Sequence, residues 1–210
     1  PVLSAALVGP LLAISLYQRS TYQALRAMRL ALTDPLSGLG NHRSFQERLK
    51  HELLRAEADD EPFTLCMIDV DDFKRINDLY GHPVGDRVLA SVGRRLRQNG
   101  EAFRLGGDEF ALLLPGVTAD EALSAAASVL ARIGSLELAD VGSVTASAGV
   151  AGFPHQAFDR DELIRLADSA LYWAKEHGKN RVHVYRPDVV ELAELRRLAH
   201  GPDRAARFRA

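Results

Sequence analysis

The stretch that most constrains the fold is FTLCMIDV, Phe63–Val70, an almost wholly apolar run that ends in acids. Eight such residues without polar alternation are typical of a strand buried on both faces in the middle of a sheet. Asp69 lies at the end of the run, and Asp71 and Asp72 follow it directly. The sequence therefore predicts a central strand whose carboxyl end carries a cluster of acids.

Strand and helix patterns alternate along the rest of the chain. Strands are expected over residues 101–105, 110–116, 143–153 and 181–185, and helices over 43–58, 72–81, 84–98, 118–134 and 159–178. Thr118 is the expected N-cap of its helix. This order predicts an α+β fold in which helices flank a central, mostly antiparallel sheet. The folded domain is expected to span residues 34–186, between an N-terminal segment (1–33) and a C-terminal tail (187–210).

Charge and cysteine content exclude some classes of protein. The formal net charge is −2 over 210 residues, so no nucleic-acid partner is expected and any phosphate binding should be local. The single cysteine, Cys66, rules out an internal disulfide framework. Because Cys66 lies in the apolar run, it is expected to be a buried, unreactive side chain, which suits a reducing cytoplasm.

The N-terminal segment is almost wholly apolar from Pro1 to Tyr17, and arginines follow at Arg19, Arg26 and Arg29. The run is shorter than the roughly 20 residues that a membrane-spanning helix needs. It is either the inner end of a span with its arginines on the cytoplasmic side, which would anchor the protein in a bacterial inner membrane, or a soluble packing helix or the tail of an upstream domain.

A helix is expected from Ile14 to about Leu32. Its seam positions follow a four, three, four spacing at Thr21, Leu25, Met28 and Leu32. This spacing is typical of a two-helix contact, so the segment is expected to be a stalk that links an upstream sensor to the domain.

The stretch FRLGGDEFALLLP breaks a strand pattern at Gly106 and Gly107 and places Asp108 and Glu109 on the break. We expect a hairpin whose turn lies at the two glycines, because a two-residue turn needs positive φ. Glycine also lets a ligand approach the backbone closely. The alternative is an ordinary turn with solvated acids.

The two groups of acids together predict a metal site. If the hairpin pairs beside the central strand, Asp69 and Asp108 approach each other, and their charges repel unless a cation bridges them. Mg²⁺ takes oxygen ligands and substrate phosphates, and the Val70 carbonyl is a further candidate ligand.

Positive groups for phosphates are available in Lys74, Lys175 and Lys179, although the last two also suit the end of a helix. Asn77 and Asp86 have the side chains that read a guanine edge, although each is also common in turns and caps.

Four motifs together resemble the GGDEF family of diguanylate cyclases: RLGGDEF, DVDDFKRINDLYGHPVGD, ADSALYWAKEHGKNRV and TDPLSGLGNHRSF. They follow the family's order from about Asp34 to Tyr185, with Ser37 where the family usually has threonine. The resemblance implies an enzyme that condenses two GTP molecules into cyclic di-GMP and two pyrophosphates in bacterial second-messenger signalling. It also implies a fold like the palm of nucleotidyl cyclases and polymerases.

The resemblance implies a role for each matching residue. Asp69, Asp108 and the Val70 carbonyl would bind Mg²⁺ (or Mn²⁺), and Glu109 would help to bind a second ion, giving two per active site. Asp108 would also assist deprotonation of the attacking 3′-hydroxyl, and Lys74 would act at the transition state. The remaining substrate-binding residues would be Gly106, Gly107, Lys175 and Lys179 at the phosphates, Asn77, His82 and Asp86 at the guanosine, and Phe73. Lys179 stands where the family often has arginine, so a bidentate phosphate contact is lost.

Each such domain would bind one GTP, so catalysis would require a homodimer whose two domains face each other, with the stalk setting their distance and angle. Three alternatives remain open: an inactive GGDEF domain that binds GTP as a regulatory or dimerisation module, a cyclase that makes another cyclic dinucleotide, and a scaffold with a vestigial site. The tail over 187–210 is either a linker to a downstream domain or a ragged end.

Product inhibition is expected to be weak. Many family members carry an inhibitory arginine–x–x–aspartate motif before the hairpin, and here the corresponding stretch is Arg97–Gly100, with glycine in place of the aspartate. Initial rates of product formation should therefore change little when cyclic di-GMP is added at low micromolar concentration. Inhibition in that range that disappears in Arg97→Ala would contradict this prediction.

Overall fold

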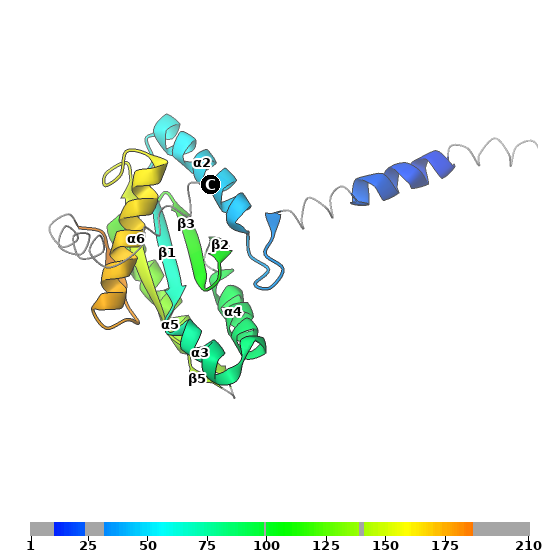
Figure 1. Ribbon diagram of the computed structural model, residues 1–210. Coiled ribbons are helices and arrows are strands. Elements are labelled where there is room, and N and C mark those ends of the chain that lie inside the picture. The colour runs from blue at the N-terminus through cyan, green and yellow to red at the C-terminus, as the bar shows by residue number, and fades with distance from the viewer. Residues whose placement is uncertain (1–10, 24–31, 99, 139–140, 187–210) are drawn as a thin grey trace, which may run out of the picture.

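The computed structural model describes residues 11–23, 32–98, 100–138 and 141–186 (Figure 1). Its centre is a five-stranded sheet with the order β2-β3-β1-β6-β7. The strands are β1 (Phe63–Val70), β2 (Glu101–Gly106), β3 (Glu109–Pro115), β6 (Ala146–Phe153) and β7 (Val182–Val184). Neighbours pair antiparallel except β6 and β7, which are parallel. The predicted mostly antiparallel α+β fold is confirmed.

Helices cover both faces of this sheet (Figure 1). The helices α2 (His42–Asp59) and α6 (Arg160–Glu176) pack on one face. The other face is covered by α3 (Phe73–Tyr80), α4 (His82–Leu96) and α5 (Ala119–Gly134). A separate two-stranded ribbon of β4 (Glu137–Leu138) and β5 (Gly142–Ser143) was not predicted.

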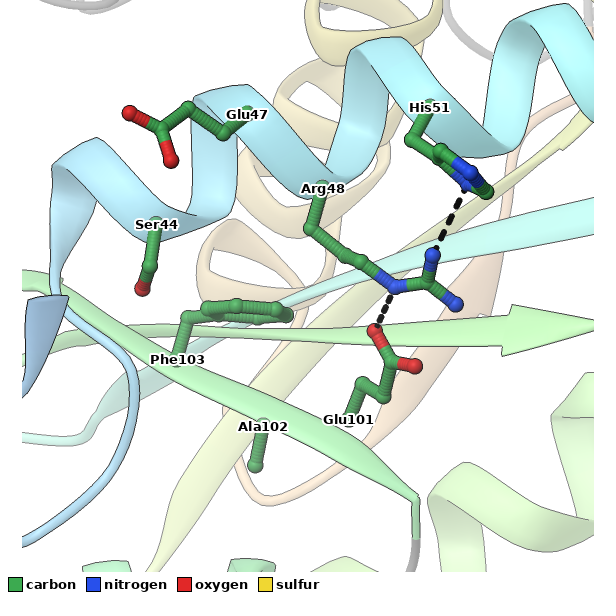
Figure 2. Close-up of a pocket in the computed structure, with 7 residues that line it drawn as sticks. All are labelled: Ser44, Glu47, Arg48, His51, Glu101, Ala102 and Phe103. Atoms are coloured by element: carbon green, nitrogen blue, oxygen red, sulfur yellow. Dashed lines mark hydrogen bonds and ion pairs between the residues drawn. The ribbon is translucent and has the colours of Figure 1, made fainter.

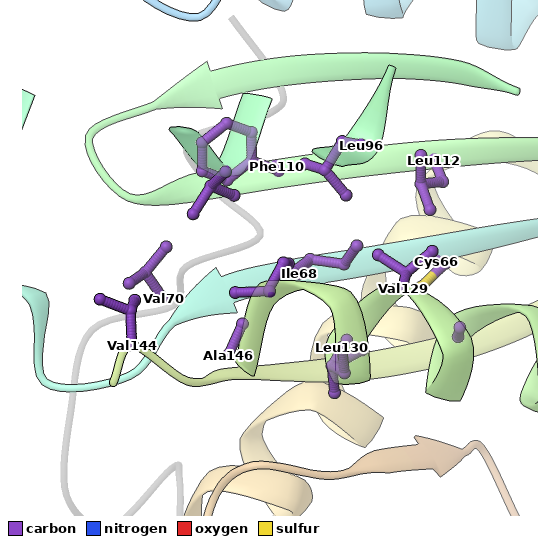
Figure 3. Packing of buried hydrophobic residues seen from close by; sticks show 14 of the residues in the cluster. Cys66, Ile68, Val70, Leu96, Phe110, Leu112, Val129, Leu130, Val144 and Ala146 are labelled. Atoms are coloured by element: carbon purple, nitrogen blue, oxygen red, sulfur yellow. The ribbon is translucent and has the colours of Figure 1, made fainter. Parts of the chain in front are cut away.

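Strand β1 is central because its side chains supply both cores, and all eight of its residues are buried. Cys66, Ile68 and Val70 point into the core under α4 and α5 (Figure 3), whereas Leu65 and Met67 point into the core under α2 and α6. Burial raises the pKa of the Cys66 thiol to about 12. The prediction of a buried, unreactive cysteine is therefore confirmed in its burial and supported in its reactivity.

Element boundaries differ from the predicted ones where turns are short. Thr118 caps α5 as predicted, because its hydroxyl accepts from the Glu121 N–H and the Glu121 carboxylate accepts from the Thr118 N–H. Helix α4 begins at His82, two residues earlier than expected, because Pro83 suits a first helical turn. The strand expected over residues 143–153 is wrong at its start, since the chain leaves β5 and enters the main sheet only at Ala146.

A helix spans residues 11–23 of the N-terminal segment, and large apolar side chains on it are exposed. The expected helix from residue 14 to 32 is thus seen in its first part, while Leu25 and Met28 of the predicted seam lie outside the described residues. Within the part of the chain that the structure describes, no helix has both the length and the apolar character needed to cross a bilayer. The tail over 187–210 also lies outside the described residues.

A lead-in segment, residues 33–41, connects the N-terminal segment to α2 and is joined to the hairpin by one arginine. The Asp34 carboxylate accepts hydrogen bonds from the Ser37 N–H (2.8 Å) and the Ser37 hydroxyl (2.7 Å). Arg104 donates from Nη1 to both Asp34 oxygens at 3.2 Å, and from Nε and Nη2 to the Gly107 carbonyl at 3.0 and 2.7 Å. Burial alone would raise the pKa of Asp34, but the hydrogen bonds from Ser37 and the Arg104 charge outweigh it and hold the pKa below its usual value.

Helix α6 lies directly against the backbone of β6 at Gly149. A Cβ atom at Gly149 would lie 2.1 Å from both the Ala167 carbonyl oxygen and the Leu171 backbone nitrogen. Only backbone would be contacted, so no side-chain movement relieves the overlap. This contact sets the height of α6 above the sheet, and α6 carries Lys175.

Gly149→Ala is expected to destabilise the protein by about 2–4 kcal/mol, because the added methyl group forces α6 away from the sheet. Thermal unfolding followed by circular dichroism measures the change. Gly134→Ala is the matched control, since a Cβ there meets nothing within 4 Å and the position is helical; it should be neutral or slightly stabilising. Equal effects of the two substitutions would contradict the packing argument.

Asp34→Asn is expected to lower the free energy of unfolding by about 1–2 kcal/mol at pH 7, because the charge-assisted hydrogen bonds weaken. The folded-state pKa of Asp34 lies below the ordinary aspartate value of 3.8, so its contribution to stability is fully present above that value and is lost as the pH falls through the folded-state pKa. Urea unfolding at pH 7 and at pH 3 should show the gap between wild type and variant shrinking, whereas Glu57→Gln on the exposed side of α2 should show little gap at either pH. A gap that stays constant to pH 3 would argue against a buried ionised Asp34.

Candidate active site

The end of β1 lies beside the hairpin that joins β2 and β3. In the β1–β3 register Asp69 lies opposite Glu109. The Val70 N–H donates to the Asp108 carbonyl at 3.2 Å, so the end of β1 lies next to the hairpin turn, and β1 and β3 have the spacing of about 4.8 Å of neighbouring strands. Asp69 is fully buried, while Asp108 and Glu109 are half-buried. The structure therefore brings together all the residues predicted to bind metal.

The turn of the hairpin corrects the prediction by one residue. The strands run to Gly106 and from Glu109, so the turn residues are Gly107 and Asp108 rather than the two glycines. Gly107 has φ 52°, in the left-handed region that glycine tolerates best. A Cβ atom on either glycine would meet nothing within 4 Å. The protein thus leaves the space over the turn free for a ligand.

The three acids at the end of β1 have different surroundings. Asp71 is buried and accepts hydrogen bonds from the hydroxyls of Thr145 (2.8 Å) and Ser147 (2.7 Å) and from the Asn180 N–H (3.0 Å). These bonds tie the end of β1 to the start of β6 and to the loop between α6 and β7. Asp71 is thus a structural anchor, and Asp69 remains the candidate metal ligand of the three.

Two of the three predicted phosphate-binding lysines reach these acids. The Lys175 Nζ lies 2.5 Å from Asp69 Oδ1, and the Lys179 Nζ lies 2.6 Å from Asp72 Oδ1. The hydrogen bond to Asp72, with the nearby negative charges of Asp71 and Asp69, raises the pKa of Lys179. Lys74 is exposed in the first turn of α3. The site therefore holds cationic groups beside its carboxylates.

The residues predicted to bind guanosine lie on the α3–α4 pair, which turns sharply at Gly81. Phe73 and Asn77 come from α3, and both pack against Gly85 of α4, where a Cβ atom would lie 1.9 Å from Asn77 Oδ1 and 3.1 Å from the Phe73 ring. Asn77 Oδ1 is enclosed and has no hydrogen-bond partner among the described residues. His82 and Asp86 are exposed on the first turns of α4. One helix pair thus presents all four side chains.

The donor set fits Mg²⁺ bound together with a nucleotide. Within the described ranges no three His, Cys, Asp or Glu side chains are grouped closely enough to bind a metal ion by themselves. Mg²⁺ commonly uses one or two carboxylates and completes its octahedral coordination with water and substrate phosphates. The carboxylates of Asp69 and Asp108 and the carbonyl of Val70 match that incomplete set.

A hollow lies elsewhere, between α2 and the edge strand β2 (Figure 2). It has a volume of about 500 Å³, and Arg48 contacts Glu101 and His51 there. A smaller polar hollow of about 240 Å³ borders Asp71 and Asp72 and the outer side of α3. Neither hollow contains the predicted catalytic acids, which are open above the hairpin turn.

Sequence reasoning assigned no role to Asp34, Arg104 or Asp71. The first lies in the motif TDPLSGLGN and the second comes two residues before Gly106, so both were within motifs already singled out. For both residues, the feature of the sequence that could have indicated a role was a charged residue next to a glycine-containing turn. Arg97 also has a structural contact, since its Nη2 donates to the Ser37 carbonyl at 3.1 Å and supports the lead-in segment.

Comparison with known proteins agrees with this arrangement. A family model described as diguanylate cyclase, GGDEF domain, matches residues 31–181. An uncharacterised protein of Bacillus subtilis, YhcK, is 41% identical over 160 residues, covering 71% of this chain and 44% of that protein. Diguanylate cyclase DgcM of Escherichia coli is 40% identical over 154 residues, covering 71% of this chain and 37% of that protein. This chain spans less than half the length of these relatives.

Solved structures show the same fold. The coiled coil and GGDEF domain of DgcB from Caulobacter crescentus, in complex with c-di-GMP, superposes with a TM-score of 0.78 at 27% identity and covers 88% of this chain and 100% of that one. The GGDEF domain of TpbB (YfiN) from Pseudomonas aeruginosa gives a TM-score of 0.72 at 32% identity, covering 77% and 99%. The chain therefore belongs to the GGDEF family of diguanylate cyclase domains.

Proposed function

We propose that this protein is an active diguanylate cyclase, which condenses two GTP molecules into cyclic di-GMP and releases two pyrophosphates. The observation that carries the proposal is that Asp69, Asp108 and Glu109 lie together at one end of the neighbouring strands β1 and β3, with Lys175 beside Asp69. An inactive GGDEF domain would not need this set of groups. The names of relatives such as DgcM, and the family model, support the same reaction.

The proposed reaction forms two identical bonds. The 3′-oxygen of each GTP attacks the α-phosphorus of the other, the bond from that phosphorus to the β-phosphate oxygen breaks, and pyrophosphate leaves with the electron pair. Each 3′-hydroxyl loses its proton as the new phosphodiester forms. Asp108 belongs to a turn held on both sides by β-strands and by Arg104, and its carboxylate would accept that proton.

Mg²⁺ (or Mn²⁺), two ions per site, would supply charge stabilisation at the phosphates, with Asp69, Asp108, Glu109 and the Val70 carbonyl as protein ligands. The chain's own cations add to this effect: Lys175 and Lys179 lie beside the acids, and Lys74 projects from the first turn of α3. The open space over Gly106 and Gly107 would admit the triphosphate. Positioning and electrostatics carry most of the catalysis in phosphoryl-group chemistry of this kind.

Guanosine would bind at the α3–α4 pair. The Gly85 contact fixes the Asn77 amide next to the Phe73 ring, and the exposed Asp86 carboxylate can accept hydrogen bonds from the N1 and N2 hydrogens of guanine. His82, at the start of α4, completes this set.

One domain supplies half of the reacting groups, so we propose that the active species is a homodimer in which the two sites face each other. The N-terminal segment would set their distance and angle in response to an upstream sensor or membrane domain. The substrate places the proposed activity in the cytoplasm.

Asp108→Asn is expected to reduce cyclic di-GMP formation by about 10²–10³-fold, because it removes a metal ligand and the group that accepts the proton. The measurement is incubation of the purified 210-residue chain with GTP and Mg²⁺, followed by chromatography of the products. Asp161→Asn is the matched control, since that acid pairs with the exposed Arg160 at the far end of α6, and it should leave the rate unchanged.

Two results would contradict the proposal. A wild-type chain that binds GTP and forms no cyclic dinucleotide at any protein concentration would identify a GTP-binding regulatory domain instead. Formation of a different cyclic dinucleotide from mixed nucleotides would show that Asp86 and Asn77 do not select guanine.

A further inference from the structure

Lys175 and Asp69 form an ion pair in the interior of the site. The Lys175 Nζ lies 2.5 Å from Asp69 Oδ1, and the exposed fraction of the side chain is 21% for the lysine and 1% for the aspartate. A buried carboxylate loses its hydration, and this loss is offset only when a cation or hydrogen-bond donors lie close to it. Lys175 therefore supplies positive charge next to the buried Asp69 carboxylate.

The pair of Lys179 and Asp72 is different although its length is similar, at 2.6 Å. The exposed fractions of these side chains are 42% and 56%. Water and salt screen an exposed pair, and such pairs contribute little to stability. The two predicted phosphate-binding lysines thus differ in their surroundings. Lys175 pairs with a buried acid, whereas Lys179 pairs with an exposed one.

Lys175 projects from α6, whose height is fixed by the backbone contact at Gly149. Its ammonium reaches the Asp69 carboxylate at the end of β1, on the face of the sheet that α6 covers. A divalent cation bound by Asp69 would need the same oxygen lone pairs, at about 2.0–2.1 Å for Mg²⁺. An ammonium and a divalent cation on the same carboxylate oxygen repel each other, so binding of one weakens binding of the other.

We propose that Lys175 is a built-in competitor for the divalent cation, so that the metal binds Asp69 only when a nucleotide triphosphate gives the displaced ammonium a new partner. This inference rests on the proposed function for the identity of the ligands. Without nucleotide, metal binding leaves Lys175 unpaired beside a positive ion. With nucleotide, the phosphates bind both the metal and the lysine. Metal and nucleotide therefore bind cooperatively, and each raises the affinity for the other by the same factor.

The experiment measures Mn²⁺ binding to the full chain without nucleotide, from the electron paramagnetic resonance signal of free Mn²⁺ at low salt. Lys175→Met, which keeps the length of the side chain and removes its charge, should bind Mn²⁺ at least about tenfold more tightly than wild type. Lys179→Met is the matched control and should stay within about twofold, because its pair is exposed. Adding a non-hydrolysable GTP analogue should bring wild type close to Lys175→Met.

Stability gives a second readout that does not depend on turnover. Lys175→Met leaves the buried Asp69 without this ion pair, so its unfolding temperature should fall in metal-free buffer and recover with Mn²⁺. If the methionine variant does not fold, Lys175→Gln, whose amide still donates a hydrogen bond to Asp69, must show the same gain in Mn²⁺ affinity.

Mn²⁺ affinity that does not rise in either Lys175 variant, or that rises equally in Lys179→Met, would overturn the inference. Its failure is separable from failure of the proposed function. Wild-type cyclase activity with no gain in Mn²⁺ affinity rejects only the competitor role of Lys175. A gain in Mn²⁺ affinity in a chain that forms no cyclic di-GMP rejects only the cyclase.

Discussion

Strand β1 pairs with β3 so that Asp69 lies opposite Glu109 and the Val70 N–H reaches the Asp108 carbonyl. The rest of the site depends on this register, because side chains alternate between the two faces of a sheet. A slip by one residue would move Asp69 from the α6 face to the α4 face, away from Lys175. It would also exchange the apolar side chains of β1 between the two cores. The apolar residues of β1 prevent that slip, since both cores accept them in one register only. The same strand register is thus needed both for the core to pack and for the site to assemble.

Local contacts then hold the surrounding loops at fixed positions. Arg104 joins the hairpin turn to Asp34 in the lead-in segment, and Asp71 joins β1 to the loop after α6. Both are charged groups with several hydrogen-bond partners, which is the condition under which a charge can be enclosed in a protein. These hydrogen bonds therefore hold the hairpin turn and the loop that carries Lys179 on the protein side, while the space above Gly107 stays open. A rigid base with an open upper side suits a site that is completed by a substrate and by a second domain.

Much of the fold followed from local pattern, and much of the site did not. The limits of β1 were predicted correctly because a continuous apolar run of this length is typical of a strand buried on both faces. Thr118 was predicted correctly as a cap because its partner Glu121 is only three residues away in the sequence. The turn was misplaced by one residue because Gly106 remains paired at the end of β2, which composition does not reveal. The ion pair between Asp69 and Lys175 joins residues that are distant in sequence, so no spacing rule predicts it. The roles of the site residues came from the family resemblance and stay predictions.

The most direct test of this account is the position of the metal. Crystals grown with Mn²⁺ and a GTP analogue whose α–β bridge resists cleavage would give an anomalous scattering peak for each bound ion. The account predicts a peak about 2.0–2.3 Å from carboxylate oxygens of Asp69 and Asp108 and from the Val70 carbonyl, with Lys175 moved onto the phosphates. A peak at Asp71 and Asp72 in the polar hollow beside α3, or nucleotide bound with Lys175 still on Asp69 and no metal there, would contradict it.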